Sequence, residues 1–355
     1  MTVPRRVAVA MSGGVDSSVA AALLVDQGVD VFGVMMRLWV EDGRVNRCCS
    51  PDDVNGARQV ASRLGIPFYV LDMKSAFREH VVDFFLDGYA HGVTPNPCIE
   101  CNRTIRWKHL LKDALGFGAT HLATGHYARV EARSGEWVLR RGVDPDKDQS
   151  YVLSVLGQTE MAHAVFPLGD YTKPEVREYA RRRRLPVAER PESQDLCFLA
   201  GDDYRAFLRR HASDGLTPGP ILNAAGAVLG RHEGLAAYTI GQRRGLRLPS
   251  NDPLYVVAKD RSTNALTVGT RAELGRASFR TLPVGWISGR PPAAAAFPAD
   301  VQVRYRAARV PCQVTPHPDA TCAVELARPL PDVTPGQSAV FYQGDICLGG
   351  GVIAA

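Results

Sequence analysis

Apolar positions in the first 200 residues gather in short runs separated by stretches of helical character. Runs typical of buried strands cover residues 6–11, 29–36, 68–71 and 119–124. A helix is expected over 17–27, ending at Gly28, and another from Ser50 to Leu64. The second begins with an N-cap serine, a proline at N1 and first-turn acids. Strands and helices alternating at this spacing predict a parallel sheet with right-handed crossovers.

The pattern changes near residue 205, where glycine, proline and short alternating segments such as 254–259 and 265–268 take over. From about residue 280 the chain is almost wholly β-like, with strands expected at 301–305, 312–315, 322–326 and 338–342. Short strands at regular spacing predict a small barrel. The predicted fold class is therefore α/β: a parallel-sheet catalytic domain over 1–204, a small β-rich central domain over 205–279 and a C-terminal β-barrel over 280–355.

Composition and charge narrow the class of protein. The 355 residues are 45% hydrophobic and 22% charged, as in water-soluble globular proteins. No apolar run approaches the ~20 residues that cross a bilayer, and the apolar stretch after Arg6 is too short for a signal peptide. We therefore expect a cytoplasmic protein without membrane contact, whose eight cysteines are mostly thiols. The net charge of +5 permits an anionic partner but does not require one.

A glycine-rich heptapeptide, Ser12–Ser18, lies between the first predicted strand and the first helix. Glycines let consecutive N–H groups converge on an anion, and the helix N-terminus adds partial positive charge. The loop lacks the lysine that ends a Walker loop, so its amides and hydroxyls suit a pyrophosphate that departs. A plain glycine turn with a helix cap is the alternative. The stretch resembles the PP-loop ATP pyrophosphatases, which activate carbonyl or amide oxygens by adenylation.

The cysteines are the second source of chemistry. Cys98 and Cys101 form a Cys-x-x-Cys on a predicted turn before a helix near Arg103, and a helix N-terminus promotes the thiolate. Cys197, flanked by apolar residues, would by itself be typical of a packing residue. The adjacent Cys48 and Cys49 precede a helix cap and are either reactive or merely exposed. Three further cysteines lie in predicted strands and are expected to pack there: Cys312, Cys322 and Cys347.

A series of motifs makes the assignment specific. They are Asn96-Pro97-x-x-x-Cys101-Asn102, Ala123-Thr124-Gly125-His126-Tyr127, Asp146-Lys147-Asp148-Gln149-Ser150-Tyr151, Phe166-Pro167-Leu168-Gly169, Thr239-Ile240-Gly241-Gln242-Arg243-Arg244-Gly245-Leu246 and Thr334-Pro335-Gly336-Gln337-Ser338-Ala339. With this series, in this order, the chain resembles the bacterial tRNA-specific 2-thiouridylases over nearly its full length. These enzymes use ATP to replace the C2 oxygen of the wobble uridine of tRNA with sulfur.

The resemblance implies roles for individual residues. Cys101 corresponds to the nucleophile and Cys197 to the carrier of a persulfide. The positions expected to bind ATP are Ala10, Met11, Ser12, Gly13, Gly14, Val15, Asp16, Ser17, Met36 and Gly125. The positions expected to meet the flipped base or other parts of tRNA are Asn96, Pro97, Cys98, His126, Lys147, Asp148, Gln149, Arg304, Tyr305 and Gln337.

The expected partners are tRNA and a persulfide donor, such as a cysteine desulfurase or a relay protein. The expected cofactors are ATP and Mg²⁺, with no metal ligands assigned among the side chains. One alternative is an iron–sulfur cluster on Cys98, Cys101 and Cys197. Another is a different PP-loop ligase, which would not need Cys101 or Cys197. A zinc-binding RNA module on Cys98 and Cys101 would need further ligands, and the chain has no second Cys-x-x-Cys.

Overall fold

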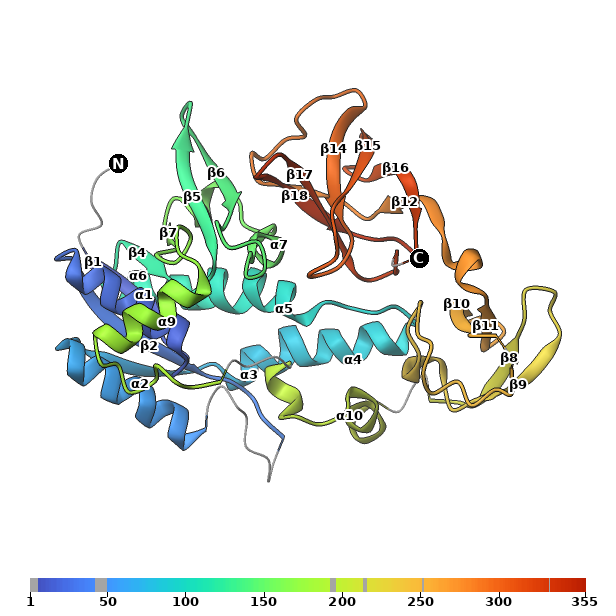
Figure 1. Ribbon diagram of the computed structural model, residues 1–355, viewed down its shortest axis with the longest axis horizontal. Helices are drawn as coiled ribbons and strands as arrows, with labels where there is room; N and C mark the ends of the chain where they lie inside the picture. The colour runs from blue at the N-terminus through green and yellow to red at the C-terminus, as the bar shows by residue number, and fades with distance from the viewer. Residues whose placement is uncertain (1–5, 42–49, 192–195, 213–215, 251, 332) are drawn as a thin grey trace.

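The computed structural model describes residues 6–41, 50–191, 196–212, 216–250, 252–331 and 333–355. Three β-sheets organise these residues (Figure 1). A parallel sheet lies near the N-terminus, a four-stranded sheet lies at the opposite end of the molecule, and a large antiparallel sheet lies between them and to one side. None of the helices in these ranges combines the length and the apolar character that a membrane span requires.

The first sheet is parallel throughout and has the strand order β3-β2-β1-β4-β7. Its strands are β1 (Arg6–Ala10), β2 (Asp30–Arg37), β3 (Phe68–Asp72), β4 (His121–Ala123) and β7 (Ala164–Val165). Strands β1, β2, β3 and β4 fall within one or two residues of their predicted positions. Because β2 lies on one side of β1 and β4 on the other, the strand order reverses at β1. An open α/β sheet binds ligands at such a reversal point.

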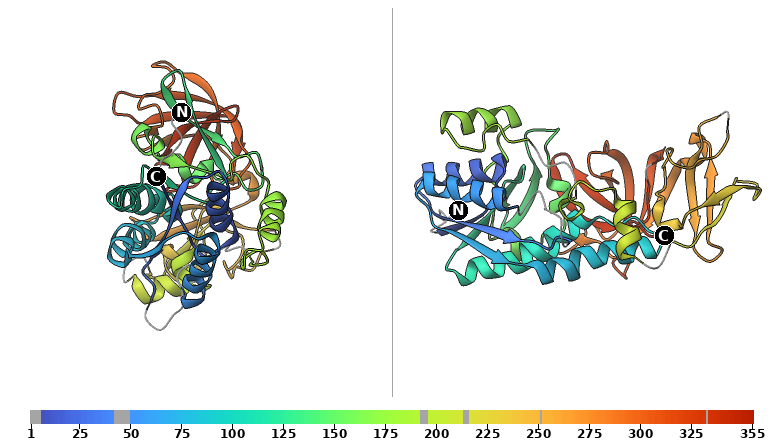
Figure 2. Two further views of the ribbon diagram at one scale, coloured as in Figure 1. Left: turned by 90° about the vertical axis from the view of Figure 1, so that its left-hand side faces the viewer. Right: turned by 90° about the horizontal axis from the view of Figure 1, so that it is seen from below.

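Helices cover both faces of this sheet (Figure 2). The helical segments of this part of the chain, besides the helix of Cys98 and Cys101, are α1 (Val15–Asp26), α2 (Pro51–Leu64), α3 (Lys74–Phe77), η1 (Arg78–Val82), α4 (Asp83–Ala90), α7 (Ser150–Leu153), α8 (Gln158–Met161), α9 (Lys173–Arg182), η3 (Cys197–Leu199) and α10 (Tyr204–His211). One core joins α1, α2 and α9 to the sheet through Ala20, Val60 and Val176. A second core lies on the other face around Phe77 and Trp107. The predicted start of α2 is confirmed, because Ser50 and Asp53 form a reciprocal capping box.

The helix that carries two of the cysteines begins earlier than predicted. It runs without a break through α5 (Pro97–Glu100), a π-helical stretch η2 (Cys101–Leu110) and α6 (Leu111–Gly116). The Asn96 side chain accepts a hydrogen bond from Ile99 N, 3.2 Å, and caps the first turn. The prediction of a turn with the helix starting near Arg103 is therefore wrong, and Cys98 and Cys101 lie within the helix. The pair Asn96-Pro97 places a capping residue before a proline at the first helical position, as Ser50-Pro51 does at the start of α2.

A hairpin from the N-terminal region completes the C-terminal sheet. Strands β5 (Ala128–Arg133) and β6 (Glu136–Arg141) join this sheet through the pairing of β6 with β18, in register Arg140 to Ile346. The order along the sheet is β12-β16-β15-β14-β17-β18-β6-β5, with β13 also paired to β18. The Asp345 carboxylate anchors the junction by accepting hydrogen bonds from Arg129 and Arg140, at 3.1 and 2.6 Å. The catalytic region and the barrel therefore share one sheet.

The remaining strands form the two β regions. The central region contains β8 (Gly219–Leu222), β9 (Val228–His232), η4 (Leu235–Ala237), β10 (Tyr255–Asp260), β11 (Ala265–Gly269) and η5 (Arg271–Leu274). The barrel contains β12 (Arg276–Thr281), β13 (Gly285–Trp286), β14 (Phe297–Gln302), β15 (Val310–Pro316), β16 (Cys322–Leu330), β17 (Ser338–Gln343) and β18 (Ile346–Val352). One barrel prediction is wrong: the strand expected at 301–305 ends at Gln302, and residues 304–307 form a turn. The strand also begins earlier than predicted, at Phe297.

Candidate active site

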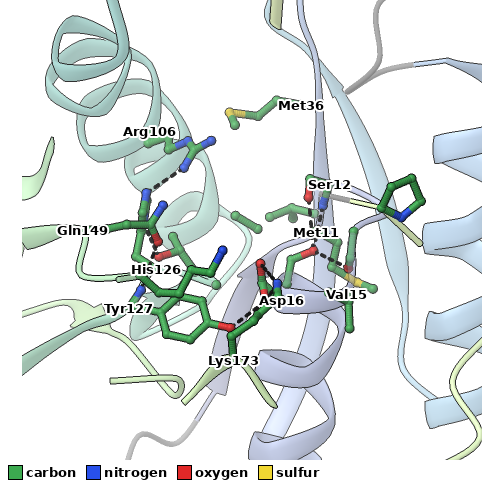
Figure 3. Close-up of a pocket in the computed structure, with 18 of the residues that line it drawn as sticks. Met11, Ser12, Val15, Asp16, Met36, Arg106, His126, Tyr127, Gln149 and Lys173 are labelled. Atoms are coloured by element: carbon green, nitrogen blue, oxygen red, sulfur yellow. Dashed lines mark hydrogen bonds and ion pairs between the residues drawn. The ribbon is translucent and has the colours of Figure 1, made fainter. Parts of the chain in front are cut away.

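A cavity of about 330 Å³ opens at the carboxyl ends of β1, β2 and β4, at the reversal point of the parallel sheet (Figure 3). Separate parts of the chain meet there: the Ser12–Ser18 loop, β2, the helix of Cys101, the segments after β4 and β6, α9 and the barrel. Its lining consists of Ala10, Met11, Ser12, Gly14, Val15, Asp16, Ser17, Val34, Met36, Arg106, Thr124, Gly125, His126, Tyr127, Lys147, Gln149, Lys173, Pro191, Tyr305 and Arg306. All the predicted ATP-binding positions except Gly13 are among these residues.

The Ser12–Ser18 loop presents hydrogen-bond donors to the cavity. No side chain caps the N-terminus of α1, where Gly14 is the N-cap residue. Ser12 N donates to the Ser17 hydroxyl, 3.1 Å, and that hydroxyl donates to Gly14 O, 3.3 Å. The loop's polar groups therefore bond mainly to one another. An anion that replaced these weak internal bonds would also gain from the partial positive charge of the helix terminus.

The loop is held from behind by residues distant in sequence. Gly13 has a φ of +76°, and a Cβ there would lie 2.6 Å from Asp53 O, so a side chain fits neither the conformation nor the space. Arg190 donates through one guanidinium nitrogen to Gly13 O, 2.7 Å, and to the Asp53 carboxylate, 2.9 Å. This bridge fixes the back of the loop against the start of α2, which accounts for the position of Gly13 outside the cavity lining.

A lysine reaches the loop from the far side of the sequence. Lys173 Nζ lies 2.6 and 2.8 Å from the two Asp16 carboxylate oxygens, and the Tyr127 hydroxyl donates to Asp16 Oδ1, 2.8 Å (Figure 3). The Lys173 side chain is only 9% exposed. The prediction that the site relies on amides and hydroxyls alone is therefore incomplete: the loop has no lysine of its own, but α9 supplies one to the cavity.

The segment after β4 packs directly on the loop. A Cβ at Gly125 would lie 2.7 Å from Ser17 N, so glycine is needed for this close approach. The buried His126 ring contacts Thr124 Oγ1 at 2.7 Å through Nδ1 and accepts from Arg106 at 3.0 Å through Nε2. Burial, and secondly the Arg106 guanidinium, hold the pKa of His126 well below its ordinary value of 6.5. His126 is therefore a neutral imidazole at physiological pH, and it positions Arg106 in the cavity.

Cys98, Cys101 and Cys197 are not part of the cavity lining. Cys101 and Cys197 are both partly buried and pack against the same hydrophobic core, and Cys98 is exposed. Arg106, on the helix of Cys101, connects that helix to the cavity. Cys48 and Cys49, whose role the sequence left open, lie outside the described residues.

The barrel cysteines are buried. Burial raises the pKa of Cys312 to about 12, of Cys322 to about 11 and of Cys347 to about 12, and makes the reactive thiolate unfavourable. This agrees with the predicted packing role. Among the described residues, no group of three or more His, Cys, Asp and Glu side chains is placed to hold a metal ion.

The positions expected to contact tRNA separate into two groups. Lys147, Gln149, His126 and Tyr305 line the cavity. The others lie elsewhere: Asn96 and Pro97 begin the helix of Cys101, and Asp148, Arg304 and Gln337 bond within the protein.

Two of these internal contacts are extensive. The Asp148 side chain, only 6% exposed, accepts hydrogen bonds from Arg141 Nε and Ser150 Oγ, 2.9 and 3.0 Å. Gln337 donates to Thr94 O, 2.8 Å, and so ties the barrel to the loop before Asn96. In this structure Asp148 and Gln337 therefore position neighbouring segments.

Sequence reasoning missed several residues of the site. Arg106, Tyr127, Lys173, Arg190 and Arg306 stand in or against the cavity, and none of them was assigned a role. Tyr127 belongs to a motif that was recognised, and Lys173 follows the helix cap Thr172, so only these two carried a local signal. The others are brought together by the fold alone.

Comparison with known proteins identifies the family. Residues 5–201 match the family described as tRNA methyl transferase HUP domain, residues 205–270 the tRNA methyl transferase PRC-barrel domain, and residues 276–353 the aminomethyltransferase beta-barrel domain. The tRNA-specific 2-thiouridylase MnmA of Chloroflexus aurantiacus is 51% identical over 352 residues, which cover 98% of both chains. The chain belongs to the MnmA family of tRNA-specific 2-thiouridylases.

Other members of the 2-thiouridylase family are similarly close. The Roseiflexus sp. enzyme is 48% identical and the Geobacter metallireducens enzyme 46% identical, and the matches cover at least 97% of every chain. The predicted fold class is confirmed: a PP-loop domain with a parallel sheet, a central domain and a C-terminal barrel. Among solved structures, the NMN synthetase from Francisella tularensis is 16% identical, with a TM-score of 0.33 over 53% of this chain and 65% of that one.

Proposed function

We propose that this 2-thiouridylase uses ATP to replace the C2 oxygen of the wobble uridine of tRNA with sulfur, in the cytoplasm. The observation that carries the proposal is one cavity to which three parts of the chain contribute. They are the Ser12–Ser18 loop, called here the phosphate loop, Arg106 from the helix of Cys101, and Tyr305 from the barrel. A nucleotide, a reactive thiol and an RNA partner would thus meet at neighbouring positions. The names of the relatives, which are tRNA-specific 2-thiouridylases, support the same activity.

The first step is adenylation. The C2 oxygen of uracil is a poor leaving group, so it attacks the α-phosphorus of ATP, and the bond to the β-phosphate breaks to release pyrophosphate. The amides at the N-terminus of α1 and the Lys173 ammonium would stabilise the charge on the departing phosphates. The target base must leave its stack to enter an enclosed site.

The second step transfers sulfur from a persulfide on Cys197, loaded by an external donor protein. The terminal sulfur attacks C2, AMP leaves, and C2 is joined to Cys197 through a disulfide linkage. The Cys101 thiolate then attacks the Cys197 sulfur and breaks that linkage. The products are the 2-thiouridine and a Cys101–Cys197 disulfide, which a cellular thiol reductant must reopen before another turnover.

The persulfide route would use a magnesium ion that accompanies the nucleotide, whereas the alternative route would need an iron–sulfur cluster. Asp16, the one carboxylate in the cavity lining, would hold a Mg²⁺ ion brought in by the nucleotide, and that ion would neutralise phosphate charge. A three-cysteine iron–sulfur cluster does not fit this arrangement, because no such group of ligands is assembled among the described residues. We therefore derive no step through a cluster.

The test is mass spectrometry of tRNA nucleosides after incubation with ATP and a persulfide source. Cys101→Ser and Cys197→Ser should each abolish 2-thiouridine, because each removes a sulfur that the route requires. Cys98→Asp, which cannot carry sulfur, should keep substantial activity in air. Loss of activity in Cys98→Asp together with loss of stoichiometric iron from anaerobically purified protein would overturn the persulfide route. Absence of 2-thiouridine with the wild-type chain would overturn the proposed function itself.

A further inference from the structure

The C-terminal barrel contributes two adjacent residues to the nucleotide cavity. Tyr305 and Arg306 are the central residues of the turn after β14, which is closed by a hydrogen bond from Ala307 N to Arg304 O, 3.0 Å. Arg306 therefore lines the same cavity as the Ser12–Ser18 loop, although it comes from a different sheet and from about three hundred positions later in the sequence.

The backbone at Arg306 is in a conformation that disfavours its side chain. Its φ is +62°, and the third residue of a turn with positive φ is usually glycine or asparagine. Seven non-glycine residues in the described ranges have a positive φ, and Arg306 is the one that lines the cavity. Strained backbone conformations are concentrated at functional sites, where the function of the side chain offsets the free-energy cost of the strain.

The charge of the cavity indicates what such an arginine would bind. Four cationic residues line it, Arg106, Lys147, Lys173 and Arg306, against the single carboxylate of Asp16. Lys173 bonds to Asp16 and Arg106 to His126. The Arg306 guanidinium lies over the Tyr305 ring, 5.4 Å from the ring centroid, and no carboxylate among the described residues forms an ion pair with it.

We propose that Arg306 binds the phosphate groups of ATP, so that the barrel completes the nucleotide site. A planar guanidinium suits this task, because it can donate two parallel hydrogen bonds to a phosphate. Since the proposed tRNA contacts Arg304 and Tyr305 are its neighbours, a barrel held by tRNA would also hold Arg306 in the cavity. The inference rests on the proposed use of ATP by this site.

A second source of phosphate must be distinguished. Arg306 also lines a second cavity, of about 530 Å³, on the barrel side with Arg141, Lys147 and Arg309, where the backbone of an RNA could lie. The nucleotide is favoured because only the first of these two cavities includes the N-terminus of α1, where backbone N–H groups and the helix dipole favour an anion.

The experiment compares Arg306→Gly with Arg184→Gly in the full-length chain. Arg184 is also an exposed arginine with positive φ, +51°, but it lies at the end of α9 and outside the cavity. Each variant removes one positive charge. Each also replaces an arginine of positive φ with glycine, which adopts that conformation without strain. Binding of the non-hydrolysable analogue α,β-methylene-ATP without tRNA, binding of tRNA without nucleotide, and thermal unfolding are measured for each.

We expect Arg306→Gly to bind the ATP analogue about tenfold more weakly than wild type, with no loss of thermal stability, and Arg184→Gly to bind it unchanged. Unchanged analogue binding with weakened tRNA binding would overturn the proposal and assign Arg306 to the RNA backbone. Unchanged binding of both would overturn it outright. A wild-type chain that binds the analogue but makes no 2-thiouridine would sink the proposed function and leave this inference standing.

Discussion

The missing side chain at position 125 is what allows the end of β4 to touch the phosphate loop. A Cβ on Gly125 would come within 2.7 Å of Ser17 N and 2.9 Å of the Asp16 carbonyl carbon, both of them backbone atoms that cannot rotate away. Glycine is required here for space, since its φ is not positive. The loop and the β4 end therefore form one rigid surface of the cavity.

Gly125→Ala should accordingly displace the loop and weaken ATP binding by roughly tenfold, since overpacking a close contact costs about 1–3 kcal/mol. The measurement is a titration with ATP or its non-hydrolysable analogue, combined with thermal unfolding. Gly116→Ala is the matched control, because a Cβ there meets nothing within 4 Å and the position is helical. Equal ATP affinity in the two variants would contradict the close-packing argument.

At the scale of the element, the helix of Cys98 and Cys101 depends on its cap. Asn96 accepts from Ile99 N, and Pro97 occupies the first helical position, where a missing N–H costs nothing. The sequence carries this Asn-Pro signal, although the Cys-x-x-Cys that follows is predicted from sequence to lie on a turn. The consequence for chemistry is that the two cysteines stand on a rigid element.

Asn96→Ala should lower the free energy of unfolding by about 1 kcal/mol through loss of this cap. Asn96→Asp should restore most of that stability, since aspartate caps equally well, while altering any contact that the amide makes with a base. Urea unfolding measures the first effect and thiolation of tRNA the second. Ser50→Ala, which removes the cap of α2, gives the reference size for a lost cap. A stability of Asn96→Ala equal to wild type would show that the cap contributes nothing.

At the scale of the whole molecule, the barrel and the catalytic region hold each other in place. The barrel turn before β17 contacts the loop before Asn96 through Gln337 and through a hydrogen bond from Thr94 N to Pro335 O, 2.9 Å. A Cβ on Gly336 would lie 2.8 Å from Thr94 N, so the two segments touch without space for a side chain. The position of the cysteine helix is thus set partly by the barrel.

Gln337→Met keeps the volume of the side chain but removes its amide donor. We expect thiolation to slow and the free energy of unfolding to fall by about 1 kcal/mol, while ATP binding stays unchanged, because the phosphate loop is not touched. The readouts are the initial rate of 2-thiouridine formation, urea unfolding and nucleotide titration. Gln343→Met, at the end of the strand that follows this turn, is the control, since Gln343 makes only a long 3.4 Å bond to Pro298 O at an exposed position. If both variants behave alike, Gln337 does not position the helix.

Local order was predictable from the sequence, and long-range assembly was not. The strand β1, the phosphate loop and the capped start of α2 are encoded within a few residues, so the parallel sheet and most of the cavity lining could be predicted. Lys173 could not be placed on Asp16, because 157 positions separate them and neither carries a motif that names the other. Arg190 and Arg306 likewise acquire their neighbours only when the chain folds.

The pairing of the hairpin β5–β6 with the last strand constrains how the protein can be made. Arg140 and Asp345, which join the hairpin to the barrel, are 205 positions apart, so the hairpin leaves the ribosome long before its partner exists. During that interval the outer edge of β6 has no strand beside it, and an unpaired edge invites association with other chains. We therefore expect nascent chains that stop before β18 to associate with other chains more readily than the completed protein.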